Sequence, residues 1–275
     1  MYEISRLLLA PVTFAYLLAS VLYWCYGVMK LRFMGTAASG LTVAALAVHT
    51  ALIVLRWVGS YEMGPELGHA PFSNLFESLV FFGWTLTLVY LIVEYKTRLK
   101  TIGSFALPLA FFAMLYALKL DPTVKPLLPA LKSNWLIAHV ITCFLGYAGF
   151  GVSFALSAMY VFSGQPKQPN APKAMLLDDL IYQTVVVGFI LLTAGIVTGS
   201  IWANSAWGSY WQWDPKETWS LITWLVYAAL LHSRLMRGWQ GRRLAVFSLV
   251  GFGCVLFTYF GVNLLPGLHA YATVQ

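Results

Sequence analysis

Runs of apolar residues long enough to cross a lipid bilayer dominate this sequence. Eight of them cover roughly residues 7–29, 36–58, 74–94, 101–118, 134–162, 182–203, 216–235 and 243–263. A spanning helix needs about 20 apolar residues, and a segment in lipid has to satisfy its backbone polar groups internally, as a helix does. The sequence therefore predicts an all-α integral membrane protein with about eight transmembrane helices.

Composition excludes the main soluble classes. Only 10% of the 275 residues are charged and 60% are hydrophobic, whereas a soluble domain carries about 25% charged residues. The cysteines Cys25, Cys143 and Cys254 lie singly inside apolar runs. They form neither a disulfide framework nor a zinc motif, and they argue against thiol–disulfide exchange as the activity.

The net charge of +7 is better explained by membrane topology than by nucleic-acid binding. Positive residues gather in cytoplasmic loops of membrane proteins. Here the loops after the first, third, fifth and seventh spans hold most of the 17 Lys and Arg residues, namely Lys30, Arg32, Lys96, Arg98, Lys100, Lys167, Lys173, Arg234, Arg237, Arg242 and Arg243. We therefore expect these loops in the cytoplasm and both termini outside.

A proline-rich connection divides the chain. Residues 163–179 contain Pro166, Pro169 and Pro172 among polar residues, a composition typical of a linker. We expect residues 1–162 to hold the first five helices with an outer loop around His69. Residues 180–275 then hold the last three helices with a tryptophan-rich outer segment between helices six and seven.

Six of the eleven tryptophans lie between positions 202 and 224. Trp207, Trp211 and Asp214 have the spacing of one helical face, if the stretch is helical. Together with Trp213 they predict a flat aromatic platform with N–H donors at its edge, suited to a planar, largely apolar ligand. The alternative is an interfacial aromatic belt, which places one or two tryptophans at a span end. Asp214 also matches the N-cap of the next helix, with Pro215 at N1 and Glu217 at N3.

Two histidines flank this segment from the same side. His139 lies near the outer end of the fifth span, and His269 follows the last span. Two imidazoles facing each other across an aromatic floor are suited to axial ligation of haem iron. Arg56 and Lys216 are the nearest outer cations for the haem propionates.

The other histidines have competing interpretations. His232 lies near the cytoplasmic end of the seventh span and His49 within the second. His49 could pair with His232, or with a histidine from another chain, in an intramembrane site. The alternative for His49 is a hydrogen bond to a neighbouring span. His69 precedes a helix start in which Ser73 or Asn74 is the cap and Glu77 lies in the first turn, so we expect structural roles there.

Several motifs carry a family resemblance. The run Trp207-Gly-x-x-Trp211-x-Trp213-Asp214-Pro-Lys-Glu, followed by Leu231-His232-Ser233-Arg234, resembles the WWD domain of haem-handling membrane proteins, and within them the System II cytochrome c biogenesis branch. Three further runs match that branch, namely Gly68-His69-x-Pro71-x-Ser73-Asn74-x-x-Glu77-Ser78, Asn134-Trp135-Leu136-x-x-His139 and Gly261-Val262-Asn263-Leu264-Leu265-x-Gly267-Leu268-His269-x-Tyr271.

The resemblance implies a role in haem (haem b) delivery. Such a protein, with a CcsB-type (ResB) membrane partner, moves haem to the outer face and attaches it to the C-x-x-C-H motif of apocytochrome c, whose thiols a reducing system keeps available. This chain would be the haem-binding subunit of that cytochrome c synthetase, or haem lyase, in a bacterial cytoplasmic or thylakoid membrane.

The resemblance also implies roles for individual residues. His139 and His269 would be the outer iron ligands, and Trp207, Trp211, Trp213 and Asp214 the platform. His232 would match an intramembrane histidine whose partner lies in the CcsB-type protein, which argues against pairing it with His49. Three alternatives stay open: a transmembrane haem electron carrier, a haem exporter without attachment activity, and a haem-free scaffold.

Overall fold

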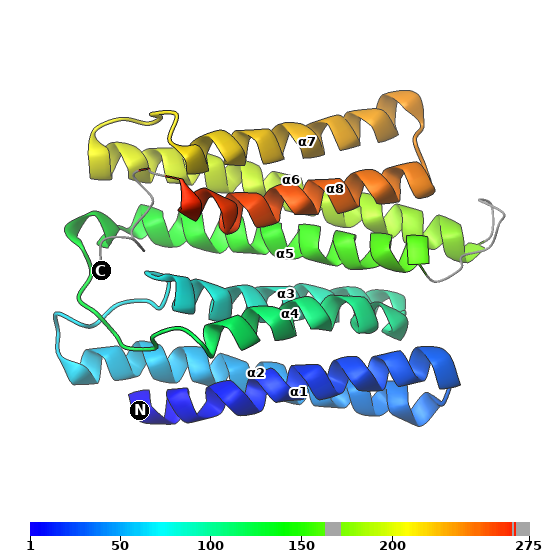
Figure 1. Cartoon of the computed structure of the whole chain (residues 1–275), viewed down its shortest axis with the longest axis horizontal. Helices are drawn as coiled ribbons and strands as arrows, with labels where there is room; N and C mark the ends of the chain where they lie inside the picture. Colours follow the sequence, from blue (N-terminus) through cyan, green and yellow to red (C-terminus); the bar gives the residue numbers. More distant parts are fainter. Residues whose placement is uncertain (163–171, 266, 268–275) are drawn as a thin grey trace. The chain divides into compact units, whose positions relative to one another are not determined.

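The structure, a computed structural model, describes residues 1–162, 172–265 and 267 and contains eight long α-helices (Figure 1). In chain order these are α1 (Tyr2–Met29), α2 (Arg32–Met63), α3 (Leu75–Thr97), α4 (Gly103–Ala117), α5 (Asn134–Phe162), α6 (Pro172–Trp207), α7 (Pro215–Arg237) and α8 (Arg242–Tyr259). Three short 3₁₀ helices are η1 (Lys100–Ile102), η2 (Pro129–Leu131) and η3 (Gly261–Leu264). No strand occurs in the described ranges, and the predicted all-α class is confirmed.

Seven of the helices are long and apolar enough to cross a membrane, in agreement with a multi-pass integral membrane protein. Helix α7 is not among them, so the eighth span and the resulting outside position of both termini stay predictions. Helix α6 begins at Pro172, inside the predicted linker 163–179, because proline fits the first turn of a helix. Residues 163–171 of that linker lie outside the described part of the chain.

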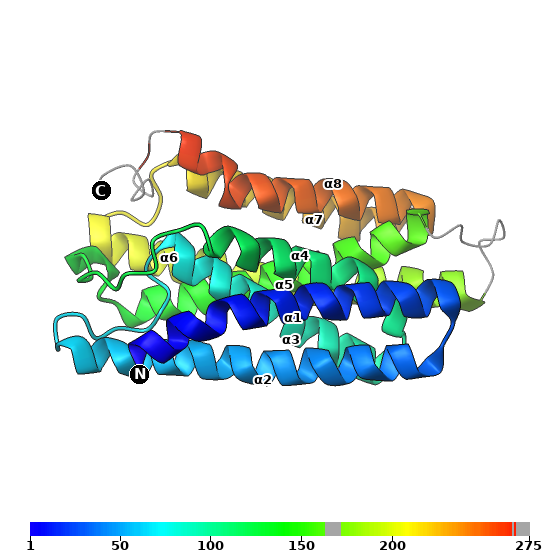
Figure 2. The same ribbon diagram turned by 60° about the horizontal axis from the view of Figure 1, so that its bottom comes forward.

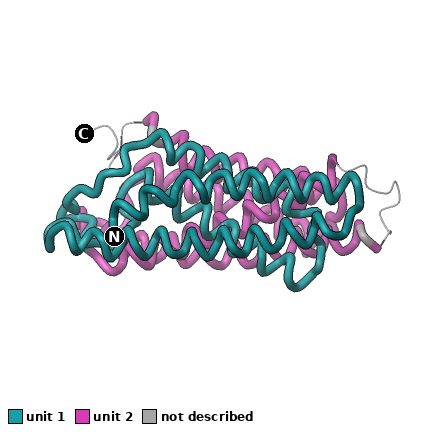
Figure 3. Tube along the Cα trace, turned by 90° about the horizontal axis from the view of Figure 1, so that it is seen from below, with its two compact units in different colours: residues 1–132 teal, residues 133–275 magenta. Residues whose placement is uncertain are grey.

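The chain folds as two compact units, residues 1–132 and residues 133–275 (Figure 3). The division falls before α5, whereas the sequence predicted one after it. Helix α5 belongs to the second unit because its glycines Gly146 and Gly149 pack directly against the backbone of α6. Whether 163–179 separates two functional blocks stays a prediction.

In the first unit, α1 lies along α2 (Figure 2) and packs on α4, which in turn packs on α3. A buried carboxylate organises one end of this bundle. Glu94 of α3 accepts hydrogen bonds from Tyr23 of α1 at 2.6 Å and from Tyr90 at 2.5 Å, and also from Ser39 of α2. Hydroxyl donors from three helices thus satisfy a group that would be costly to bury alone.

In the second unit, α5 packs on α6 and α8, and α7 packs on both α6 and α8. Arg234 near the end of α7 pairs with Asp178 at 2.6 Å and Asp179 at 3.0 Å, both near the start of α6. Asp178 also accepts the backbone N–H of Gly241 in the α7–α8 turn. One arginine thus joins two helix ends and a turn.

The two predicted helix caps are confirmed. Asn74 accepts the Glu77 N–H at the start of α3. At the start of α7, Asp214 accepts the Lys216 N–H and Glu217 reaches back to the Asp214 N–H, which completes a capping box. These reciprocal bonds satisfy backbone donors that a helix start leaves open.

We expect α7 to cross the membrane, because it contains the apolar run 216–235. The loops before and after it should then lie on opposite sides of the membrane. The exposed residues Gln212 and Gln240 lie beyond its two ends. A membrane-impermeant maleimide applied to intact cells should label Gln212→Cys and leave Gln240→Cys unlabelled until the membrane is opened. The unsubstituted protein gives the background from its three cysteines, and labelling of both variants from one side would contradict a spanning α7.

Candidate functional site

His139 of α5 lies in a defined seat on α6. Its part-buried ring places Nδ1 2.8 Å from the carbonyl oxygen of Gly195. Since a carbonyl only accepts, Nδ1 carries the proton and donates it. The ring is nearly parallel to that of Trp202, at 14° and 6.2 Å between centroids. Trp202 in turn meets Trp207 edge-on at 4.8 Å, so a chain of ring contacts joins His139 to the tryptophan-rich segment within the second unit.

The sequence did not reveal two members of this seat. Trp202 is one of the six clustered tryptophans, and the sequence gives it no role of its own. Gly195 lies inside the apolar run 182–203 with nothing to distinguish it. The available signal was the spacing of Gly195, Gly199 and Trp202, which share one face of α6 at i, i+4 and i+7.

The stretch between α6 and α7 is a loop, so the helical-face interpretation of Trp207, Trp211 and Asp214 is wrong. Helix α6 ends at Trp207, and Gly208 follows with a φ of 76°, a left-handed conformation that interrupts the helix. Trp213 also has a positive φ, of 58°.

The loop tryptophans do not share one plane. The rings of Trp211 and Trp213 are perpendicular, at 89° with centroids 5.8 Å apart, and Trp213 is 68% exposed. The pair therefore presents the face of one ring beside the edge of the other, and the surface they form is not flat.

Two carboxylates hold this loop in place. Glu217 Oε2 accepts the backbone N–H groups of Gln212, at 2.7 Å, and Asp214, at 3.2 Å. Asp214 itself is 7% exposed and caps α7. The backbone on both sides of Trp213 is thereby tied to the start of a helix, while the indole stays accessible.

The two cations expected near a ligand have different surroundings. Arg56 is buried in the first unit, where its side chain is 3% exposed and pairs with Glu77. Lys216 of the second unit forms no side-chain hydrogen bond or ion pair with the residues that the structure describes. The Asp214 carboxylate is the charged group near it. Of the two cations, Lys216 is the one that lies at the tryptophan-rich segment.

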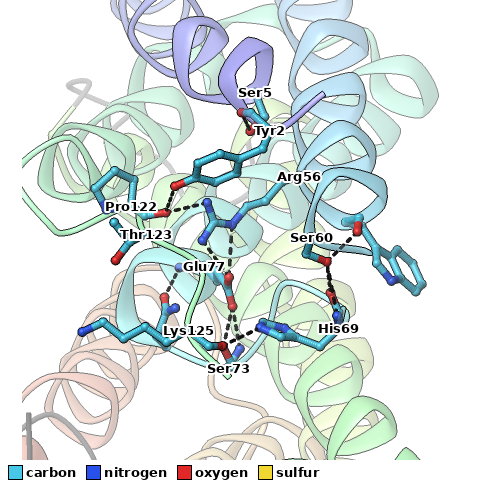
Figure 4. Close-up of polar contacts among 12 residues, drawn as sticks. Tyr2, Ser5, Arg56, Ser60, His69, Ser73, Glu77, Pro122, Thr123 and Lys125 are labelled. Carbon is cyan, nitrogen blue, oxygen red and sulfur yellow. Dashed lines mark hydrogen bonds and ion pairs between the residues drawn. The ribbon is translucent and has the colours of Figure 1, made fainter. Parts of the chain in front are cut away.

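Arg56 is the centre of a polar cluster in the first unit (Figure 4). Its Nε and Nη2 donate to Glu77 Oε1 at 3.1 and 2.8 Å, and its Nη1 donates to the Pro122 carbonyl at 2.8 Å. Tyr2 donates to the same carbonyl at 2.8 Å, and the rings of Tyr2 and Phe76 face the guanidinium. This Arg56 cluster joins α1, α2, α3 and the loop after α4.

His69 is part of the loop structure beside that cluster (Figure 4). Its backbone N–H donates to Ser60 Oγ at 3.2 Å, and its ring nitrogens lie 2.9 Å from the Ala70 carbonyl and 3.3 Å from the Lys125 carbonyl. Both nitrogens face loop carbonyls, which agrees with the structural role expected for His69. Among the described residues, no group of three or more His, Cys, Asp and Glu side chains could hold a metal ion.

The remaining histidines are distributed over both units. His49 is fully buried in the first unit, bonded through Nδ1 to the Tyr16 hydroxyl at 2.9 Å. Its Nε2 is buried and has no hydrogen-bond partner among the described residues. His232 is an exposed residue of α7 in the second unit. His269, the second expected outer ligand, lies outside the described residues.

Comparison with known proteins gives consistent matches over most of the chain. Residues 72–269 match the family described as cytochrome C assembly protein. The chain is 39% identical to the cytochrome c biogenesis protein CcsA of Synechococcus elongatus, over 94% of this chain and 95% of that protein. It is also 39% identical to the CcsA protein of Guillardia theta, over 94% of each.

Among solved structures, the fold is similar to that of the cytochrome c haem lyase CcmF. The TM-score is 0.73 at 20% identity, over 93% of this chain and 46% of that one. At this identity the likeness concerns the fold alone.

We expect Arg56→Ala to destabilise the protein by about 3–5 kcal/mol, because it leaves Glu77 buried without its cation. The matched control is Arg6→Ala, whose pair with Glu3 at 3.4 Å is exposed and should contribute less than about 1 kcal/mol. Chemical unfolding in detergent micelles measures both. The double variant Arg56→Met with Glu77→Leu removes the unpaired charge and should recover only part of the loss, because Ser73 then loses its acceptor on Glu77. Equal midpoints for the two single arginine variants would contradict the prediction.

Proposed function

Because this chain belongs to the cytochrome c assembly protein family and so has a role in cytochrome c maturation, we propose that it binds haem and presents it at the outer face of its membrane. There the haem becomes covalently attached to apocytochrome c, together with a CcsB-type (ResB) partner protein. Haem b is the substrate of this reaction, and the C-x-x-C-H motif of the apocytochrome is its acceptor.

The seat of His139 is the observation that carries the proposal. Its Nδ1 proton is held by the Gly195 carbonyl, so in the neutral ring the lone pair is on Nε2. A backbone acceptor on the far nitrogen is the usual arrangement behind a metal-ligating histidine. Nε2 forms no hydrogen bond with the described residues. The residue is thus prepared to ligate iron, and we propose His269 as the second outer ligand.

The surroundings of His139 suit the rest of a haem molecule. Trp207, Trp211 and Trp213 supply apolar ring surface for a planar macrocycle. Lys216, which forms no ion pair with the described residues although the Asp214 carboxylate lies nearby, supplies a cation for a propionate. Asp214 keeps the loop in register with α7 through its cap.

The attachment needs positioning more than proton transfer by the protein. Haem supplies two vinyl groups, and each cysteine thiol adds across one of them, with sulfur bonding to one carbon and the thiol hydrogen to the other. No leaving group is released, so no side chain of this chain has to act as a general acid or base. What the chain contributes is a fixed haem orientation, which raises the effective concentration of the reacting groups.

A second haem position completes the proposal. His232 is exposed on α7, and we propose that it ligates haem near the cytoplasmic face with a histidine of the partner protein. His49 is enclosed within the first unit and bonded to Tyr16, which favours the structural alternative for it. A haem electron carrier would need two complete ligand pairs in this chain, and the described residues favour His139 alone as a prepared ligand.

The test is the optical spectrum of the purified protein. We expect wild type to show a six-coordinate haem with two histidine ligands, and His139→Ala and His269→Ala each to lose most of that signal until imidazole is added. His69→Ala is the matched control, because both of its ring nitrogens face loop carbonyls. Identical spectra for the wild type and the two ligand variants would overturn the outer site. Haem export without cytochrome maturation in cells would support the exporter alternative.

We expect Trp213→Gly to separate stability from binding. Glycine adopts the positive φ at no cost, so the variant should be as stable as wild type or more stable by about 1 kcal/mol. Loss of the exposed indole should lower haem occupancy several-fold. Unfolding midpoint and Soret absorbance per protein measure the two effects. Trp24→Ala, which removes a 62% exposed tryptophan of α1, is the control, and an equal effect on haem from both variants would favour the aromatic-belt interpretation.

A further inference from the structure

The contact between α5 and α6 is made through small residues along one face of each helix. On α6 these are Gly188, Gly195 and Gly199, and on α5 the facing residues include Cys143 and Gly146. A Cβ on Gly146 would lie 3.0 Å from the Leu192 backbone nitrogen and 3.1 Å from the Gly188 carbonyl oxygen. The helices therefore approach at backbone distance at this point.

Towards one end of this contact, side chains of α5 occupy the space that the α6 glycines leave open. A Cβ on Gly195 would overlap the Cys143 sulfur. A Cβ on Gly199 would lie 2.5 Å from His139 Nδ1 and 2.7 Å from Cε1. The space that a side chain at Gly199 would fill is thus occupied by the imidazole.

The ring is held on the sides that face α6 and Cys143. It is bonded to the Gly195 carbonyl at 2.8 Å and lies nearly parallel to Trp202. Cys143, one turn further along α5, places its sulfur 3.6 Å from Nδ1. A methyl group at Gly199 would force the ring out of this seat, and the Nδ1 bond would be strained or lost.

We infer that Gly195 and Gly199 of α6 are positioning residues for His139. Gly195 holds the Nδ1 proton through its carbonyl, and Gly199 leaves the room in which the ring lies. This inference rests on the proposed function for its consequence, since it makes the geometry of the iron ligand depend on two glycines that touch no haem. It assigns to α6 the orientation of a ligand that α5 carries.

The variant Gly199→Ala tests the inference. Its purified protein should show a roughly tenfold loss of six-coordinate haem, since disturbing the partner that orients a metal-ligating histidine typically lowers metal affinity by about 10- to 100-fold. Added imidazole should restore the six-coordinate spectrum, because it replaces a displaced ring without needing the seat. The haem spectrum and the imidazole titration are the readouts, and no attachment activity is required.

Two glycine controls separate positioning from packing. Gly253→Ala on α8 meets no atom within 4 Å and should leave both the spectrum and the unfolding midpoint nearly unchanged. Gly146→Ala strains the same α5–α6 contact two turns from the histidine. It should lower the unfolding midpoint while the folded fraction keeps the wild-type spectrum. If Gly146→Ala and Gly199→Ala change the spectrum alike, the glycine at 199 has only a packing role and the inference fails.

The outcomes also distinguish this inference from the proposed function. If His139→Ala leaves the haem spectrum unchanged, the proposed ligand is wrong and the inference falls with it. If His139→Ala loses the signal while Gly199→Ala matches Gly253→Ala, the ligand stands and the positioning role is wrong. Loss in both His139→Ala and Gly199→Ala, with imidazole rescue of each, supports both.

Discussion

Within a bilayer there is no water to hydrogen-bond a peptide group, and this constraint decides most of the structure. Eight helices satisfy their own backbones, and where the chain leaves a helix its polar groups are met by particular side chains. Glu217 accepts two N–H groups of the loop before α7. Arg56 reaches the Pro122 carbonyl of the loop after α4. Buried charges follow the same rule, since Arg56 is balanced by Glu77 and Arg234 by Asp178.

At the candidate site the hydrogen-bond partner of a buried polar group is a backbone carbonyl and not a side chain. The Gly195 carbonyl accepts from His139 on the neighbouring helix, and it does so because glycines let the two helices come together. Ligand orientation and helix packing are therefore one arrangement in the second unit. In the first unit a side chain has the corresponding role, because the Glu94 carboxylate accepts hydrogen bonds from hydroxyl groups of three helices.

What could be predicted from sequence was local. Helix runs follow from apolar length, and the caps at Asn74 and Asp214 follow from residue types at fixed offsets. Glycine has no such signature, because its role depends on what lies opposite. The spacing of Gly195, Gly199 and Trp202 marks one face of α6, but it does not identify His139 as the residue that lies against that face. The spacing of Trp207, Trp211 and Asp214 misled for a related reason. Residues at this spacing share a face only within a helix. The chain leaves the helical conformation at Gly208 and returns to it after the cap at Asp214. His269 lies beyond the described residues, so its part in the site is still a prediction.

The conformation of Trp213 has a kinetic consequence. A bulky residue in the left-handed region is unfavourable by about 1 kcal/mol or more, yet Glu217 and the α7 cap hold the backbone there. The backbone of this loop is therefore ordered by folding itself. We expect a ligand to meet that backbone already in place, so that its rate of binding is set by encounter and not by rearrangement of the loop backbone.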